Sequence, residues 1–208
     1  MKGSVTRSSV KMSLACRSMG IAIAWICGLA YPSAAIEVQP IQAQVQLALD
    51  RGKEAAAHGH TPETFYVRFG RHDTVHSGGF LVTKLGGLSV LATHMALRGR
   101  EPSGADIAHV MEASTMLVTA IIYGDSPSLG VNSYLALDQD GRVIKPVTVR
   151  ADGQARRNTT WPESPKFQAK VVAAFSYTDF DPQAQTTITV FPASGGEIHF
   201  SLNFAAID

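Results

Sequence analysis

Apolar and polar side chains alternate along most of the chain from residue 64 onward. In the first such stretch, Phe65, Val67 and Phe69 are separated by Tyr66 and Arg68. A period of two places successive side chains on opposite faces, which is typical of a half-buried β-strand. Alternation or a short apolar run predicts eight further strands, at residues 80–84, 88–97, 116–124, 131–138, 142–150, 169–177, 186–192 and 196–204.

Turn-forming residues separate these predicted strands. Asp140-Gly141 joins two of them, and Asp-Gly is a strong signal for a tight hairpin because glycine accepts positive φ. Gly195-Gly196 has the same position before the last strand. Nine short strands separated in this way predict a mainly β fold, an antiparallel β-sandwich of the immunoglobulin-like or a related type with one or two helices. An open α+β sheet is the alternative.

Two segments have the periodicity of helices instead. Residues 40–57 begin with Pro40, which suits a first helical turn, and carry apolar residues on one face. This helix either packs on the domain or forms a loose N-terminal arm. Residues 103–113 start with Ser103 and Asp106 in the positions of a capping box, and this helix is expected to bridge the sheets or cover one end. Residues 155–168 hold two prolines and predict a long surface loop.

The first 35 residues have the pattern of an export signal. Basic residues precede the apolar run at 21–30, and the small residues Ser33 and Ala35 stand where a signal peptidase requires them. Ten apolar residues are too few for a membrane anchor, which needs about 20. We therefore expect cleavage after Ala35, with translation starting at Met1 or Met12. The predicted organisation is a signal peptide at 1–35, an N-terminal helix or arm at 36–62 and one β-domain at 63–208.

Cleavage would change the chemistry available to the mature chain. Both cysteines, Cys16 and Cys27, would leave with the signal, which excludes disulfides and a cysteine nucleophile. Four of the 18 Lys and Arg also lie in the signal, so 14 would remain against 17 Asp and Glu. Without a basic run, nucleic acid is not an expected partner. We expect a bacterial periplasmic or secreted protein with no membrane span after cleavage, in which the sequon at Asn158 is accidental.

Four of the seven histidines lie within residues 58–76 and raise the question of a metal site. His58 and His60 follow the predicted N-terminal helix and can cap its last carbonyls. His72 and His76 lie beyond the strand at 65–69, which separates the two pairs by about 17 Å when it is extended. Zinc needs three or four converging ligands. A periplasmic metal-binding module using His72 and His76 therefore stays an alternative function, and no metal or other cofactor is predicted.

The stretch AIIYGDSPSLG at residues 120–130 resembles the first block of the SGNH or GDSL hydrolases. That resemblance implies a serine nucleophile at Ser126, which would require a general base and an oxyanion hole. The family supplies its base from an Asp-x-x-His near the C-terminus, and here the downstream histidine is His199, preceded by Glu197-Ile198. We expect His199 to point away from the apolar face and to be solvated or hydrogen-bonded across the sheet.

The sequence does not assemble a complete catalytic set. The pairs Asp138 with Asp140 and Asp179 with Asp181 are explained by turns rather than by a calcium loop. We therefore predict an exported, non-catalytic domain of the cell envelope or secreted fraction that binds or scaffolds a protein or glycan partner. A serine hydrolase using Ser126 is the enzyme alternative.

Overall fold

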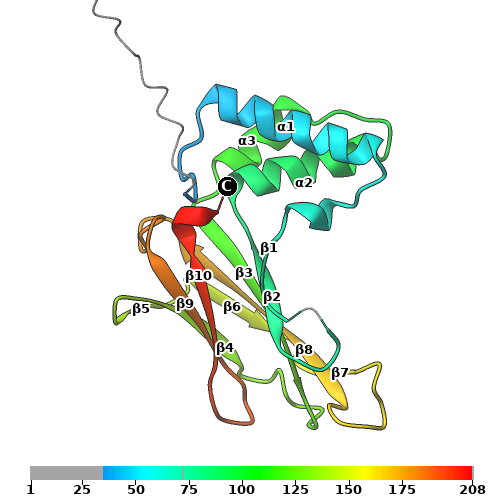
Figure 1. Ribbon diagram of the computed structural model, residues 1–208, viewed down its shortest axis with the longest axis vertical. Helices are drawn as coiled ribbons and strands as arrows, with labels where there is room; N and C mark the ends of the chain where they lie inside the picture. The colour runs from blue at the N-terminus through cyan, green and yellow to red at the C-terminus, as the bar shows by residue number, and fades with distance from the viewer. Residues whose placement is uncertain (1–34, 72, 208) are drawn as a thin grey trace, which may run out of the picture. The chain divides into compact units, whose positions relative to one another are not determined.

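The computed structural model describes residues 35–71 and 73–207 (Figure 1). Residues 1–34 of the predicted export signal, and His72, lie outside the described residues. Within the described part, ten strands form two antiparallel sheets, accompanied by three α-helices and two short 3-10 helices. The predicted mainly β, antiparallel fold is therefore confirmed, with more helix than the one or two elements expected.

The first sheet follows the strand order β1-β2-β3-β8-β6, with β7 also paired to β8. Its longest ladder joins β3 to β8 over ten consecutive pairs, from Thr115 opposite Ser176 to Gly124 opposite Phe167. The strands of this sheet are β1 (Val67–Gly70), β2 (Gly78–Val82), β3 (Thr115–Gly124), β6 (Thr148–Ala151), β7 (Arg156–Arg157) and β8 (Phe167–Ser176).

The second sheet has the order β10-β9-β4-β5. Its strands are β4 (Tyr134–Gln139), β5 (Arg142–Ile144), β9 (Gln185–Phe191) and β10 (Ile198–Asn203). Asp140 and Gly141, which connect β4 to β5, have φ of 53° and 80°, as a tight hairpin of this type requires. Gly195 and Gly196 also have positive φ, between the paired strands β9 and β10. Both predicted hairpins are confirmed.

The inner faces of the two sheets contribute to one hydrophobic core. From β3, every second side chain is fully buried, and the second sheet adds Leu135, Leu137, Ile188 and Val190 with no exposed surface. Each such side chain contributes about 1.5–3 kcal/mol when it leaves water. Period-two alternation thus determines which side of each sheet faces the core.

Three helices form a second, smaller apolar cluster. They are α1 (Gln42–Ala57), α2 (Lys84–Ala96) and α3 (Gly104–Met111), drawn together at one end of the sheets in Figure 1. The helix predicted at 40–57 is present as α1, and it packs on α2 rather than forming a loose arm. Ser89 Oγ donates to the Ala48 carbonyl at 2.8 Å, and Thr93 Oγ1 donates to the Gly52 carbonyl at 3.0 Å. Within the described ranges, no helix is long and apolar enough to span a membrane.

The strand predicted at residues 88–97 is wrong, because this segment belongs to α2. Thr83 caps the helix by accepting a hydrogen bond from the Gly86 N–H, so that Gly86-Gly87 lies in the first turn instead of separating two strands. Helix α2 contacts α1, α3 and the 3-10 helix η1 (Pro62–Phe65). Its sequence therefore has apolar residues on nearly all sides. Without a polar face, its periodicity did not distinguish helix from strand.

Three other predicted boundaries were also wrong. Phe65 ends η1, so the strand predicted at 65–69 begins only at Val67. The segment 142–150 is two strands in different sheets, separated by a stretch that contains Pro146. The loop predicted at 155–168 contains β7 and the beginning of β8. The helix predicted at 103–113 is confirmed as α3, and Ser103 and Asp106 form its capping box.

Gly52 is required by the close approach of α1 to α2. A Cβ atom there would lie 2.3 Å from the Ser89 carbonyl oxygen and 2.7 Å from the Ala92 Cβ. We predict that Gly52→Ala lowers the free energy of unfolding by about 1–3 kcal/mol, since overpacking outweighs the helix propensity of alanine. Urea denaturation followed by circular dichroism measures this.

Gly104→Ala is the matched control, because that helical glycine has open space around it. It should leave stability unchanged or raise it by about 0.4–1 kcal/mol. Equal effects of the two substitutions would contradict the close helix contact.

Candidate functional site

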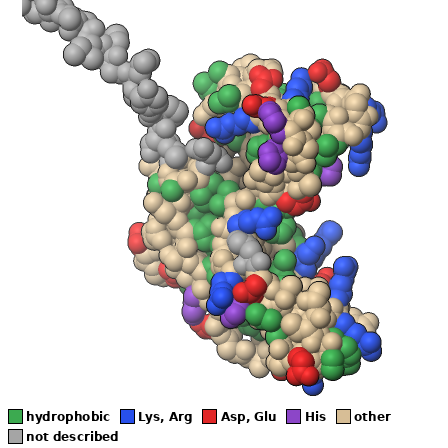
Figure 2. Space-filling view, turned by 45° about the vertical axis from the view of Figure 1, so that its right-hand side comes forward, with side chains coloured by type: hydrophobic (Ala, Val, Ile, Leu, Met, Phe, Trp, Pro, Cys, Tyr) green, Lys and Arg blue, Asp and Glu red, His purple; other side chains and the backbone are tan. Residues whose placement is uncertain are grey.

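The histidines do not assemble into one site. His58 Nδ1 donates to the Glu54 carbonyl at 2.9 Å, which confirms the predicted cap at the end of α1. The His60 ring lies 6.4 Å from the His58 ring, and His76 lies beyond β1. Figure 2 shows histidine side chains both in the helical part and in the sheet part of the visible face. Among the described residues, no group of three or more His, Cys, Asp or Glu side chains is placed to hold a metal ion.

His76 belongs to a small network with Asp73 and Arg71. Its Nδ1 donates to the Asp73 carboxylate at 2.8 Å, and Arg71 Nη1 lies 3.3 Å from its Nε2. Burial alone would raise the pKa of Asp73, but hydrogen bonds from the Val75 N–H, the His76 N–H and the His76 ring lower it to about 2. The network stabilises the loop between β1 and β2.

The low pKa of Asp73 links this loop to acid stability. Its value of about 2 lies below the ordinary 3.8, so the carboxylate stabilises the fold above about pH 4 and loses that contribution as pH falls toward 2. We predict that the wild type loses more stability than Asp73→Asn between pH 5 and pH 2.5. Urea unfolding of both proteins across that range tests this, and parallel pH profiles would contradict it.

Ser126 lies in the turn after β3, and its hydrogen bonds are those of a turn. Its Oγ lies 2.8 Å from Ser128 Oγ and accepts from the Ser128 N–H at 3.2 Å. The preceding Asp125 accepts from the Ser164 hydroxyl and the Lys166 N–H. His199 lies on β10 of the other sheet. Asp125 of the Gly-Asp-Ser stretch thus connects the turn after β3 to the segment that contains Ser164 and Lys166.

Other residues considered from the sequence also have structural partners. His199 Nδ1 lies 3.0 Å from Thr189 Oγ1 on the neighbouring strand, which confirms the predicted cross-sheet hydrogen bond. Asp138 accepts from the Gly141 N–H and Asp181 from the Gln183 N–H, as turn residues do. Asn158 is buried and its Nδ2 donates to the Thr74 carbonyl, so its amide holds a loop in place.

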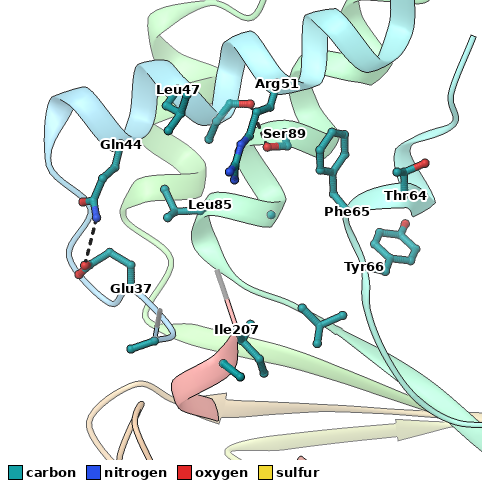
Figure 3. A pocket seen from close by; sticks show the side chains of 15 residues that line it. Glu37, Gln44, Leu47, Arg51, Thr64, Phe65, Tyr66, Leu85, Ser89 and Ile207 are labelled. Carbon is teal, nitrogen blue, oxygen red and sulfur yellow. Dashed lines mark hydrogen bonds between the residues drawn. The ribbon is translucent and has the colours of Figure 1, made fainter. Parts of the chain in front are cut away.

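A cleft of about 450 Å³ lies between the helices and the nearby ends of the sheets (Figure 3). Its walls come from α1, α2, the segment 64–67, the first described residues and the last ones. The residues that line the cleft are Ala35, Glu37, Gln44, Leu47, Ala48, Arg51, Thr64, Phe65, Tyr66, Val67, Leu85, Gly86, Ser89, Ala206 and Ile207. Because these positions span almost the whole described chain, no local motif could have indicated them.

Helix α1 contributes to the core on one face and to the cleft on another. Val45, Leu49 and Gly52 are buried against α2. Leu47 and Arg51, one turn apart, line the cleft instead, and the Leu47 side chain is 55% exposed. The contact with α2 therefore determines the direction in which these two side chains point.

The polar groups of the cleft differ in whether other groups of the protein already form hydrogen bonds or ion pairs with them. Glu37 accepts from the Gln39 N–H at 3.1 Å and from Gln44 Nε2 at 3.4 Å. Ser89 donates to the helix backbone. Among the ion pairs of the described residues, none includes Arg51. Figure 3 shows the Arg51 guanidinium directed toward the open part of the cleft.

Tyr66 lies at the edge of the cleft, beside Phe80 of β2. Its ring stacks on Phe80 with 4.4 Å between centroids and 11° between planes, which fixes its orientation. Burial raises the pKa of Tyr66, and the nearby Glu63 raises it further. The phenol therefore stays protonated at neutral pH and can donate a hydrogen bond.

The cleft thus combines apolar walls with one cation, Arg51, and one carboxylate, Glu37, that already accepts hydrogen bonds from Gln39 and Gln44. Leu47, Phe65, Leu85 and Ile207 offer an apolar surface, and Arg51 offers a charge-assisted bond to an anion. This is the usual composition of a binding site, in which few polar groups orient a mainly apolar ligand. The part of the cleft around Arg51 fits an apolar group that carries one negative charge.

Comparison with known proteins adds no assignment. No protein-family model matches this chain, and no curated protein matches it either.

Proposed function

We propose that this protein is an exported, non-catalytic domain of the cell envelope or secreted fraction that binds a partner protein in the cleft. The bound element would be a peptide segment with apolar side chains and a carboxylate close to them, as at a C-terminus. The observation that carries this proposal is Arg51, a cation without an ion-pair partner in the described residues, set among apolar side chains.

The size of the cleft and the side chains that line it support the proposal that it binds a peptide segment. Its 450 Å³ lies within the roughly 300–1,000 Å³ typical of ligand sites. A bound apolar side chain would cover Leu47, which is otherwise half exposed at a cost of about 25 cal/mol per Å² of apolar surface. A hydrogen bond between Arg51 and a carboxylate would add about 1.5–3 kcal/mol.

Export is supported by the leader pattern before Ile36, and the finer fold assignment by the shared core. Two antiparallel sheets with a common hydrophobic core are what we would expect of a β-sandwich of the immunoglobulin-like or a related type. Such domains are widely used for recognition, although fold alone does not determine function.

Two kinds of substitution test the proposed binding in the cleft. One removes the positive charge of Arg51, and the other removes the apolar surface of Leu47. We predict that a peptide ending in Leu-Phe with a free carboxylate binds about tenfold or more tightly than its C-terminal amide, since 1.4 kcal/mol is a factor of ten. Arg51→Gln should remove this difference, while Arg98→Gln, at an exposed arginine outside the cleft, should preserve it. Isothermal titration calorimetry of the wild type and both variants with each peptide measures all six affinities.

Leu47→Ser should weaken both forms of the peptide, because it removes apolar wall without touching the charge. Its exposure makes an effect on folding small. A carboxylate preference that persists in Arg51→Gln would rule out this mode of binding.

If the protein is exported, signal cleavage should give the mature chain one defined N-terminus. When the full chain is expressed in a bacterium, the protein in the periplasm or medium should begin at Ile36. Intact-mass measurement decides this, and Ala35→Asp should block processing because the cleavage site requires a small residue. A full-length chain that stays inside the cell would contradict export.

A further inference from the structure

The outer face of the first sheet carries cations that the sequence keeps far apart. Strand register places Arg68 beside Phe80, Phe80 beside Thr119, Thr119 beside Val172, and Val172 beside Arg150. These five residues form one row across β1, β2, β3, β8 and β6, and the row faces away from the core. Four strand spacings of about 4.8 Å put the two arginine positions about 19 Å apart.

The neighbouring rows extend the same pattern. Leu117 pairs with Ala174 on one side, and Ile121 pairs with Lys170 on the other. Farther along, Gln168 pairs with Arg156 of β7. We call this surface the basic face, defined by Arg68, Arg150, Arg156 and Lys170 around the apolar residues Phe80, Leu117, Ile121 and Val172. Figure 2 shows Lys and Arg side chains projecting from the sheet part of the molecule.

The cations of the basic face have no ion-pair partner within the described chain, and the carboxylates of Asp73 and Asp152 lie in the same surface hollows as some of them. None of its four cations takes part in an ion pair of the described residues. The adjacent acids have other hydrogen-bond donors: Asp152 accepts from the Lys170 N–H, and Asp73 accepts from His76. The charge is therefore available to a partner, although the chain after Ala35 has more acidic than basic residues.

Two shallow hollows flank Ile121 on this face. One, of about 170 Å³, is lined by Arg68, Arg71, Asp73 and Tyr123 among others, and the other, of about 230 Å³, by Asp152, Arg156, Gln168 and Lys170. Both hollows offer cationic and hydrogen-bonding groups beside an apolar centre. A partner that spans the face would place negative groups in both hollows.

We propose that the basic face binds an acidic polysaccharide. A sugar polymer that crosses the strands can direct carboxylates or sulfates to the cations at the margins and lay its C–H surfaces over the apolar centre. A membrane fits less well, because apolar groups must enter the lipid by about 5–10 Å. Here they lie on a strand surface between longer cationic side chains. The choice of polysaccharide over nucleic acid rests on the proposed export.

The test uses polygalacturonate and heparin as probes and neutral dextran as the uncharged control. Both anionic probes should bind and dextran should not. Binding to a linear polyanion releases counterions, so the slope of log Kd against log salt concentration should fall by about one for each cation removed. The Arg68→Gln/Arg150→Gln variant should therefore have a slope that is smaller by about two, and it should bind both anionic probes at least tenfold more weakly.

Arg98→Gln/Arg142→Gln is the matched control, since it removes the same charge from exposed positions outside the basic face. It should keep both the slope and most of the affinity. Leu117→Ser should weaken polygalacturonate binding without changing the slope. The unfolding midpoint of each variant confirms that it is folded.

Three results would overturn the proposal. Equal losses in the two double variants would show a nonspecific charge effect. Tighter binding to polyglutamate or DNA than to both anionic polysaccharides would assign the face to another polyanion. Tighter binding to phosphatidylglycerol vesicles would assign it to a membrane. Because Arg68→Gln/Arg150→Gln leaves the cleft intact, the carboxylate peptide should bind this variant normally whichever result is found.

Discussion

The register of β3 with β8 is the constraint on which the rest of the structure depends. Along these ten pairs, alternate residues of β3 point into the shared core, where Met116, Val118 and Ile122 are fully buried. The residues between them form the centre of the basic face. A slip of one residue would exchange the two sets and expose the core. Hydrophobic burial therefore determines the positions of the cations at the same time.

The same sheet places the helices and, through them, the cleft. Helices α2 and α3 lie in the chain between β2 and β3, whose last pairs join Leu81 to Val118 and Val82 to Leu117. This pairing brings the two ends of the helical segment together at one end of the sheet. Gly52 then lets α1 approach α2 closely, and the remaining surface of α1 becomes a wall of the cleft.

Local patterns predicted most strands, because alternation and glycine turns are properties of short segments. They failed at α2, whose apolar residues face neighbours on several sides, and at Pro146, where one apparent strand divides between two sheets. The cleft could not be predicted, since its residues come from both ends of the described chain. The basic face was missed for a similar reason: its cations form no run, and only strand pairing gathers them.

The cleft and the basic face are proposed as two separate binding surfaces of one protein, and one experiment tests this directly. Amide chemical shifts of ¹⁵N-labelled protein are recorded while the carboxylate peptide is added, and in a second sample while polygalacturonate fragments are added. The peptide should move the signals of Leu47 and Arg51, and the polysaccharide should move those of Thr119 and Val172. Both ligands perturbing the same residues, or neither perturbing its expected pair, would contradict the account.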